Sequence, residues 1–398
     1  MELPTFRELL TPRGQAALAD AAALAPTEAG FLHAFEKLRK RHPDERARAA
    51  LETVLLRDRA KPRHSLAERF YFTRESLEQS SSETVSRYRA ERFQEYSTVL
   101  DLCCGAGMDA LQLAATGCRV EAIDNDPVRL AMAEANAEAA GLADRIRFHL
   151  GDVLAMPLPR ADVAFFDPSR RSGERRHLAP SQYQPPVDQV LARFPAGFPI
   201  GVKLAPGVAK HDLEPFDAER EFISWEGELK ECTLWFGPMK TIRFRATILP
   251  GHTLCADDPP DEPPAAPLGE FLFDPDSSIV RAGLVGRLAE QLEAAPIEPG
   301  VALLSGPRRI QSPFATVYHV EVNLPLRAEK LRDYLREHGI GRVTLLKRAI
   351  DLDVNELQRR LRLSGRGQRH LFLTRAEGKR VAIVVEPASD EAGNPAGL

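Results

Sequence analysis

Four aspartates between residues 101 and 167 each stand at or near the end of a short apolar run. They are Asp101, Asp124, Asp152 and Asp167, and helical stretches separate most of the runs. Apolar runs that alternate with helical stretches predict βαβ units and a parallel sheet. Open sheets of this kind bind ligands outside the carboxyl ends of their strands. We therefore expect the four carboxylates to gather around one ligand.

The segment Asp101–Gly107 reads Asp-Leu-Cys-Cys-Gly-Ala-Gly and directly precedes a helical stretch. Glycines at such a point let the backbone approach a ligand closely, and the next helix begins facing it. Gly105, Gly107 and Ala110 also fit the dinucleotide fingerprint, with Asp124 as the acid that would bind a ribose. The glycines alone therefore leave a dinucleotide and other nucleoside cofactors open.

The charge of Asp101 separates these cofactors. A dinucleotide would place an anionic pyrophosphate beside this carboxylate, which would repel it. S-adenosylmethionine (AdoMet) instead presents a cationic amino group that a carboxylate can bind, usually through water. Asp124 would then accept hydrogen bonds from the ribose hydroxyls and Asp152 from the adenine amino group. The set favours AdoMet, although each aspartate taken singly also fits helix capping or turn chemistry.

The order of these motifs resembles the class I AdoMet-dependent methyltransferases, which implies a Rossmann-like sheet. Further segments extend the resemblance over nearly the whole chain, and they are Tyr71–Ser80, Val202–Gly207, Gly227–Glu231 and Leu346–Asp353. Together they are similar to bacterial class I methyltransferases with a C-terminal THUMP-like domain. THUMP domains bind structured RNA in tRNA- and rRNA-modifying enzymes, so the resemblance implies an RNA substrate.

Asp167-Pro168-Ser169-Arg170 stands where such an enzyme would position its methyl acceptor. Methyltransferases that act on base amino groups usually carry Asn/Asp-Pro-Pro and an aromatic residue there, and this chain lacks the second proline and the aromatic. The motif is also similar to that of RNA uracil C5 methyltransferases, whose nucleophile only Cys232 could supply. Residues 170–176 hold four arginines and one glutamate, net +3. This loop fits a phosphate-bearing acceptor and a solvated loop about equally well.

The candidate site residues fall into three sets. The cofactor-binding set is Asp101, Cys103, Cys104, Gly105, Ala106, Gly107, Asp109, Asp124, Asn125, Asp152, Val153 and Asp167. The catalytic set is Asp167, Pro168, Ser169 and Arg170. The substrate or lid set is Phe72, Thr73, Gln79, Arg171, Lys203 and Lys230. Its first three members come from the resemblance of Tyr71–Ser80 to the segment that covers the cofactor in RNA-cap guanosine methyltransferases, and the two lysines fit ion pairs with Glu228 or Glu231 equally well.

The fold class expected from these patterns is α/β, with five segments along the 398-residue chain. The length exceeds what one core usually supports. We expect an N-terminal helical domain (1–95), an AdoMet-binding methyltransferase domain with a Rossmann-like sheet (96–252), a Pro/Asp-rich linker (253–269), a C-terminal α/β THUMP-like domain (270–388) and a disordered tail (389–398).

Charge and composition limit the partners. A net charge of −4 excludes a protein that binds nucleic acid over its whole surface, so RNA would contact local patches such as residues 325–380, with net +8, or the arginine-rich loop. Residues 37–63, with net +6, fit a solvated helix face better. No long apolar run predicts a membrane span, and no His, Cys, Asp or Glu spacing predicts a metal. Five cysteines without a disulfide pattern indicate the cytoplasm.

The leading hypothesis is an AdoMet-dependent methyltransferase that acts on a base of rRNA or tRNA. Two alternatives stay open at this point. One is methylation of a small molecule or a protein, with the C-terminal domain serving assembly. The other is an RNA-binding protein that holds AdoMet structurally. An NAD-dependent oxidoreductase fits the sequence least well.

Overall fold

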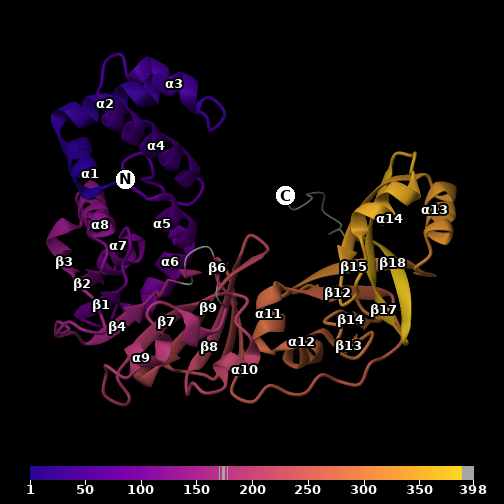
Figure 1. The fold of residues 1–398 in the computed structure, drawn as a ribbon. Coiled ribbons are helices and arrows are strands. Elements are labelled where there is room, and N and C mark those ends of the chain that lie inside the picture. The colour runs from indigo at the N-terminus through magenta and orange to yellow at the C-terminus, as the bar shows by residue number, and fades with distance from the viewer. Residues whose placement is uncertain (170, 173–174, 177, 388–398) are drawn as a thin grey trace. The chain divides into compact units, whose positions relative to one another are not determined.

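The computed structural model describes residues 1–169, 171–172, 175–176 and 178–387 (Figure 1). The chain forms two compact units. The first contains Met1–Arg220 and Lys230–Thr241, and the second contains Glu221–Leu229 and the chain from Ile242 onward. The tail expected at residues 389–398 lies outside the described residues, and the other domain boundaries expected from the sequence remain predictions.

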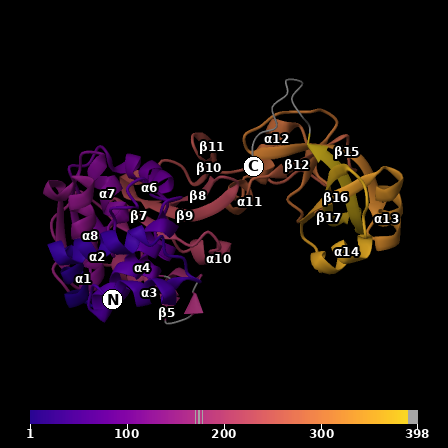
Figure 2. The ribbon, with the colours of Figure 1, turned by 90° about the horizontal axis from the view of Figure 1, so that it is seen from above.

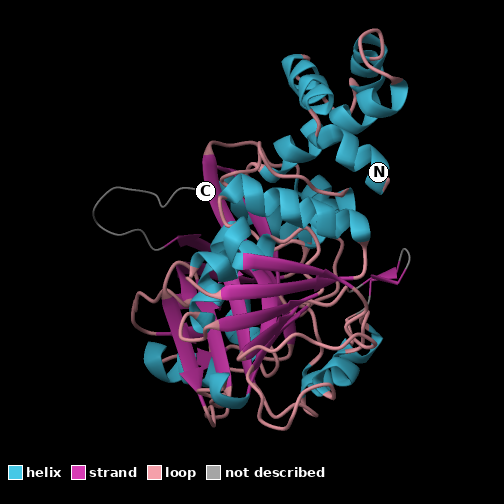
Figure 3. Cartoon of the chain, turned by 90° about the vertical axis from the view of Figure 1, so that its left-hand side faces the viewer, coloured by secondary structure: helices cyan, strands magenta, loops and turns pink. Residues whose placement is uncertain are grey.

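The first unit begins with six helices: α1 (Leu3–Leu10), α2 (Pro12–Ala23), α3 (Phe31–Leu38), α4 (Asp44–Ala60), α5 (Arg74–Gln79) and α6 (Glu83–Ala90). Thr11 caps α2 by accepting from the Gly14 amide, and Pro12 begins that helix with a suitable φ. The first four helices bury a shared core that includes Phe6 and Phe35, together with Met132 of the later helix α8. Figure 1 shows α1–α4 above α8, and Figure 2 shows α1 and α2 beside α8; in Figure 3 the helices nearest the N-terminus lie apart from the strands.

The parallel part of the sheet in this unit consists of β1 (Thr98–Leu102), β2 (Arg119–Asp124), β3 (Ile146–Leu150), β4 (Val163–Phe166) and β7 (Ile200–Leu204). The helices between them are α7 (Met108–Ala115), α8 (Pro127–Ala140) and α9 (Val187–Leu191), and α10 (Lys210–Leu213) follows β7. All four residues of β4 are buried because it lies between β1 and β7. The predicted α/β class with a parallel sheet is confirmed.

Antiparallel strands extend this sheet. They are β8 (Glu219–Trp225), β9 (Glu228–Phe236), β10 (Phe244–Ile248) and β11 (His252–Ala256). The complete strand order is β11-β10-β8-β9-β7-β4-β1-β2-β3, and β9 runs antiparallel to β7. Two short strands, β5 (Arg171–Ser172) and β6 (Arg175–Arg176), pair antiparallel in a separate two-stranded sheet. Among the described residues no helix is long and apolar enough to cross a membrane.

The second unit contains a seven-stranded sheet in the order β13-β14-β12-β15-β18-β17-β16. Its elements are β12 (Phe271–Pro275), α11 (Ser277–Ala282), α12 (Val285–Leu292), β13 (Ala295–Pro296), β14 (Leu304–Gly306), β15 (Ala315–Pro325), α13 (Ala328–Glu337), β16 (Ile340–Lys347), α14 (Val354–Leu361), β17 (Gly367–Ala376) and β18 (Lys379–Pro387). Asp353 caps α14 by accepting from the amides of Asn355 and Glu356. Leu335 of α13 and Leu361 of α14 are buried in one core with leucines and valines of the sheet.

Candidate functional site

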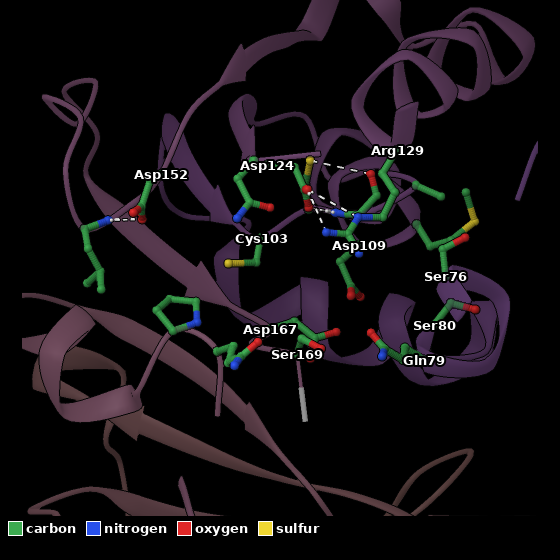
Figure 4. Close-up of a pocket in the computed structure, with 18 of the residues that line it drawn as sticks. Ser76, Gln79, Ser80, Cys103, Asp109, Asp124, Arg129, Asp152, Asp167 and Ser169 are labelled. Atoms are coloured by element: carbon green, nitrogen blue, oxygen red, sulfur yellow. Dashed lines mark hydrogen bonds and ion pairs between the residues drawn. The ribbon is translucent and has the colours of Figure 1, made fainter. Parts of the chain in front are cut away.

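A cavity of about 270 Å³ lies at the carboxyl ends of the parallel strands (Figure 4). Several parts of the first unit contribute to it: α5, the loop after β1, the first turns of α7 and α8, the ends of β2, β3 and β4, and a segment before α9. The lining residues are Ser76, Gln79, Ser80, Cys103, Cys104, Gly105, Ala106, Met108, Asp109, Asp124, Asn125, Arg129, Asp152, Leu154, Asp167, Ser169, Gln184, Pro185 and Pro186. The structure therefore brings most of the predicted cofactor set together around one space. Asp101, Gly107 and Val153 are not among the lining residues.

The loop after β1 has an unusual backbone that suits close contact with a ligand. Gly105 has φ +56°, and a Cβ placed on it would project into open space. Gly107 has φ +82°, and a Cβ there would lie 3.0 Å from the Cβ of Ala133 in α8. Cys103 also adopts a positive φ of 65°, which is strained for a residue with a side chain. Gly105 thus leaves room for a ligand, whereas Gly107 allows the loop to approach α8.

Asp101 is completely buried at 0% exposure, and neither of its carboxylate oxygens has a hydrogen-bond partner among the described residues. Burial raises the pKa of this carboxyl well above its usual value, and the nearby charges of Asp109 and Asp167 raise it further. Buried polar atoms nearly always have partners, so an orphaned carboxylate near the lining residues Asp109 and Asp167 indicates a missing donor. A cationic amino group fits this position.

Asp124 and Asp152 differ sharply in their surroundings. Asp124 is buried and accepts hydrogen bonds from the amides of Gly105, at 2.8 Å, and Asp126, at 2.9 Å. Arg129, a lining residue that the sequence reasoning missed, pairs with Asp124 at 3.2 Å. Asp152 is exposed and accepts from the Leu154 amide at 2.9 Å, which is a turn contact. Asp124 is therefore held firmly in the cavity wall, while Asp152 stands at its edge, as does exposed Asn125.

Asp167 and Lys203 form an ion pair at the adjoining ends of β4 and β7. The Lys203 ammonium lies 2.5 Å from Oδ2 of Asp167 and also donates to the Gln79 carbonyl at 3.4 Å. Lys203 is 5% exposed, so this charge is shielded from solvent. Burial raises the pKa of Asp167, and the Lys203 ammonium opposes that effect. A single cation thus contacts both the Asp167 carboxylate and the end of α5.

A second buried cation, Arg89 of α6, lies behind Asp109. Its guanidinium pairs with Asp109 and Glu231, donates to the Ser81 hydroxyl at 3.3 Å, and lies over the ring of Phe165. Arg89 is 2% exposed. Sequence reasoning missed it because an arginine on a short polar helix is usually solvated. Its burial depends on Glu231, which comes from the distant strand β9.

Helix α5 supplies one wall of the cavity through Ser76, Gln79 and Ser80. Of the three expected lid residues, only Gln79 is among the lining residues. Thr73 begins α5 as its cap in a capping box with Ser76. Phe72 is buried in the core and stacks on His64 at 5.6 Å. His64 lies 3.4 Å from the Ser80 hydroxyl, and burial lowers the pKa of His64 to about 4.

The wall on the acceptor side comes from Ser169 and from Gln184, Pro185 and Pro186. Ser169 and Gln184 form a two-way backbone bridge, with distances of 3.1 and 2.9 Å. This bridge brings Pro185 and Pro186 to the cavity from outside the Asp167-Pro168-Ser169-Arg170 segment. Sequence reasoning missed them, although adjacent prolines are a visible signal of a fixed loop.

The remaining predicted site residues are Arg170, Arg171, Pro168 and Lys230. Arg170 lies outside the described residues, and Arg171 is placed only through its backbone in β5. Pro168 and Lys230 are not among the lining residues, and Lys230 lies partly exposed in β9. In the part of the chain that the structure describes, no group of His, Cys, Asp and Glu could hold a metal ion.

Comparisons with known proteins agree with this geometry. Residues 96–201 match the family described as RNA cap guanine-N2 methyltransferase, residues 315–387 match the THUMP domain-like family, and residues 2–60 match a domain of unknown function. An uncharacterized S-adenosylmethionine-dependent methyltransferase of Mycobacterium tuberculosis (strain CDC 1551 / Oshkosh) is 35% identical over 343 residues, which are 83% of this chain and 93% of the relative.

A crystal structure from Porphyromonas gingivalis, of a protein assigned to the methyltransferases, superposes with a TM-score of 0.76 at 20% identity. It covers 96% of this chain and 99% of the other. This likeness confirms the fold, including the C-terminal α/β domain. The orphaned carboxylate of Asp101 and the open space at Gly105 fit AdoMet, which is the cofactor of this group. The chain belongs to the S-adenosylmethionine-dependent methyltransferases.

Proposed function

We propose that this methyltransferase modifies an exocyclic amino group of a base in structured RNA, such as rRNA or tRNA. The observation that carries the proposal is the placement of Asp167. Lys203 occupies its Oδ2, which leaves Oδ1 for a donor from the acceptor in the same cavity. An amino group of a base offers such a donor. The match of residues 96–201 to a guanine-N2 methyltransferase family and the THUMP-like match of residues 315–387 support the choice of RNA.

Bound AdoMet supplies an electrophilic methyl group, and the chain's own residues would hold and orient the two reactants. Asp101 would bind the cofactor's amino group and Asp124 its ribose hydroxyls. Asp167 would accept a hydrogen bond from an N–H of the acceptor through Oδ1, which orients the nitrogen for in-line attack. The negative charge of the carboxylate would stabilise the positive charge that develops on that nitrogen. The proton released from that nitrogen would leave through Oδ1 of Asp167 to water. Lys203 would keep this carboxylate ionised and in place.

The cavity wall formed by Gln184, Pro185 and Pro186 suits a flat base, because the two prolines can take the place of the aromatic residue that this chain lacks. Pro185 and Pro186 present apolar ring faces, and the exposed Gln184 can both donate and accept hydrogen bonds at a base edge. Gln184 forms no side-chain hydrogen bond among the described residues. Base recognition would therefore combine an apolar wall with the Gln184 amide and the Asp167 carboxylate.

The test is transfer of a labelled methyl group from AdoMet to total RNA from a strain that lacks this gene, followed by nucleoside analysis. We expect label in a nucleoside methylated on a base amino group. Asp167→Ala should abolish the transfer while AdoMet binding, measured by calorimetry, persists. Label in protein or small molecules instead of RNA would contradict the proposal. RNA binding without any transfer would indicate a binding protein that holds AdoMet structurally.

A further inference from the structure

A second cavity, of about 480 Å³, lies in the C-terminal unit beside β16, the last strand of the seven-stranded sheet. It is lined by Gly341, Arg342, Val343, Thr344, Gln358, Leu363 and Gln368. The lining combines one guanidinium, two amides and a hydroxyl with two aliphatic side chains. Its size falls in the range of small-ligand sites. The chemistry suits a ligand that has an anionic part and a flat part with hydrogen-bonding edges.

One end of this cavity is fixed by a close contact between two glycine segments. A Cβ on Gly341 would lie 2.0 Å from the carbonyl oxygen of Gly365, and a Cβ on Gly365 would lie 2.3 Å from that of Gly339. The Gly367 amide donates to the Gly339 carbonyl at 3.0 Å. Only glycines allow the backbones to meet so closely. The start of β16, which carries Arg342, is therefore held in a defined position.

The arginines of this region fall into two groups. Arg360 pairs with Glu329, and Arg369 pairs with Glu321 and Glu386, so internal carboxylates neutralise both. Arg342, Arg362 and Arg366 are exposed and have no ion pair among the described residues. Arg362 precedes the lining residue Leu363, and Arg366 lies two residues before Gln368. Arg342 therefore brings an unpaired positive charge to the cavity itself, whereas other exposed arginines without an ion pair among the described residues, such as Arg327 and Arg375, are not among its lining residues.

We propose that this cavity binds one unpaired nucleotide of the RNA substrate. Its phosphate would pair with Arg342, and its base would meet the amides of Gln358 and Gln368 and the aliphatic surface of Val343 and Leu363. Proteins read single-stranded RNA in this way, by splaying out a base and hydrogen-bonding its edges. The inference rests on the proposed function for the choice of RNA, and it adds where and how the C-terminal domain would contact that RNA.

The test measures binding of the full chain to a short single-stranded RNA oligonucleotide and to the duplex of the same sequence, at several salt concentrations. Arg342→Ala should weaken single-strand binding about tenfold, as expected for a hydrogen bond to a charged group. It should also reduce the slope of log affinity against log salt by about 0.7, the value for one phosphate contact on a single strand. The double variant Gln358→Ala/Gln368→Ala should weaken binding and leave the slope unchanged. Arg375→Ala, an exposed arginine of β17 without an ion pair among the described residues, is the matched control.

Equal losses for Arg342→Ala and Arg375→Ala would overturn the inference, because they would indicate a diffuse basic surface. Equal losses on single strand and duplex would overturn it as well. The open edge of β16 could instead pair with a strand of a second copy, and a change of mass by light scattering without a change in RNA affinity would show that. Methyl transfer is measured separately. Wild-type protein that methylates RNA, with Arg342→Ala binding as wild type does, refutes this inference alone, whereas absent transfer with intact oligonucleotide binding refutes only the proposed function.

Discussion

Replacing Asp101 by asparagine should raise the stability of the cofactor-free protein and lower its affinity for AdoMet. The carboxyl is fully buried and lacks a partner among the described residues, and burial raises its pKa well above the usual value. In the unfolded chain the same group ionises near pH 3.9. Above that pH, release of the proton stabilises the unfolded state, while the folded state still holds the proton. The asparagine side chain has nearly the same shape as the carboxyl it replaces and does not titrate.

The size of this effect follows from proton linkage. Below the unfolded pKa the wild type keeps its full stability. As the pH rises toward the folded pKa, Asp101 lowers the free energy of unfolding by about 1.4 kcal/mol per pH unit. The advantage of Asp101→Asn should grow at that rate. In a unit of this size each 1 kcal/mol shifts the melting temperature by roughly 2–4 °C, so the advantage should grow by about 3–6 °C per pH unit.

The assay compares melting temperatures of the wild type and Asp101→Asn from pH 4 to pH 7, without AdoMet. Asp152→Asn is the matched control, since Asp152 is exposed and its contact is a turn. Calorimetry then gives AdoMet affinity, which should fall tenfold to a hundredfold in Asp101→Asn, as for the loss of a hydrogen bond to a charged group, about 1.5–3 kcal/mol. A melting advantage that does not grow with pH, or a variant less stable than the wild type near pH 7, would refute the reasoning.

Three further outcomes follow from the same contacts. Lys203→Met should raise the pKa of Asp167, because the Lys203 ammonium opposes the effect of burial. The acid limb of kcat/KM against pH should therefore move to higher pH, while AdoMet affinity stays within a few-fold of wild type. An acid limb that does not move would assign Lys203 a purely structural role. His64, whose pKa is about 4 in the folded state, should show no NMR titration above pH 5, and it should cost about 3 kcal/mol of stability as the pH falls from 6.5 to 4. That loss is opposite in sign to the Asp101 effect, so only the difference between variant and wild type isolates Asp101; a His64→Gln variant that keeps the acid loss would contradict the assignment. Asn136→Ala removes three buried hydrogen bonds, at 2.7, 3.0 and 2.9 Å, that connect α8 to the segment before α5 and to the glycine loop. The free energy of unfolding, measured with denaturant, should fall by about 3–4 kcal/mol. A fall of less than about 1 kcal/mol would mean that other contacts replace these hydrogen bonds.

The cofactor side of the cavity could be predicted from the sequence because chain topology determines it. In a parallel sheet the residues that follow each strand meet at one edge, so Asp124 and Asp167 could be placed together from strand ends alone. Arg89 could not be placed in this way. It lies on a helix outside the sheet, and its burial depends on Glu231, a partner far along the chain. Arg129 was missed for a related reason, because the direction in which a helical side chain points is known only once the helix is packed in the fold.

The basic C-terminal region shows what a charge count leaves out. The net charge of +8 over residues 325–380 predicted a patch for RNA. In the structure, Arg360 and Arg369 of that count pair with carboxylates, and Glu321 and Glu386 lie outside the counted range. Pairing across neighbouring strands and helices is a tertiary property that composition does not contain. Arg360 and Arg369 therefore contribute less to an RNA-binding surface than the charge count implied.

The four aspartates that look equivalent in the sequence have different energetic roles because their partners differ. Asp152 is solvated, Asp124 is satisfied by backbone amides and Arg129, and Asp167 is held by Lys203, so none of these three needs a ligand for compensation. Of the four, Asp101 alone is buried with no partner among the described residues. If it binds the amino group of the cofactor, that group is the same in AdoMet and in S-adenosylhomocysteine, which differ at the sulfur. Asp101→Asn should then weaken both by the same factor in calorimetry, and unequal losses would place the missing partner of Asp101 nearer the sulfur.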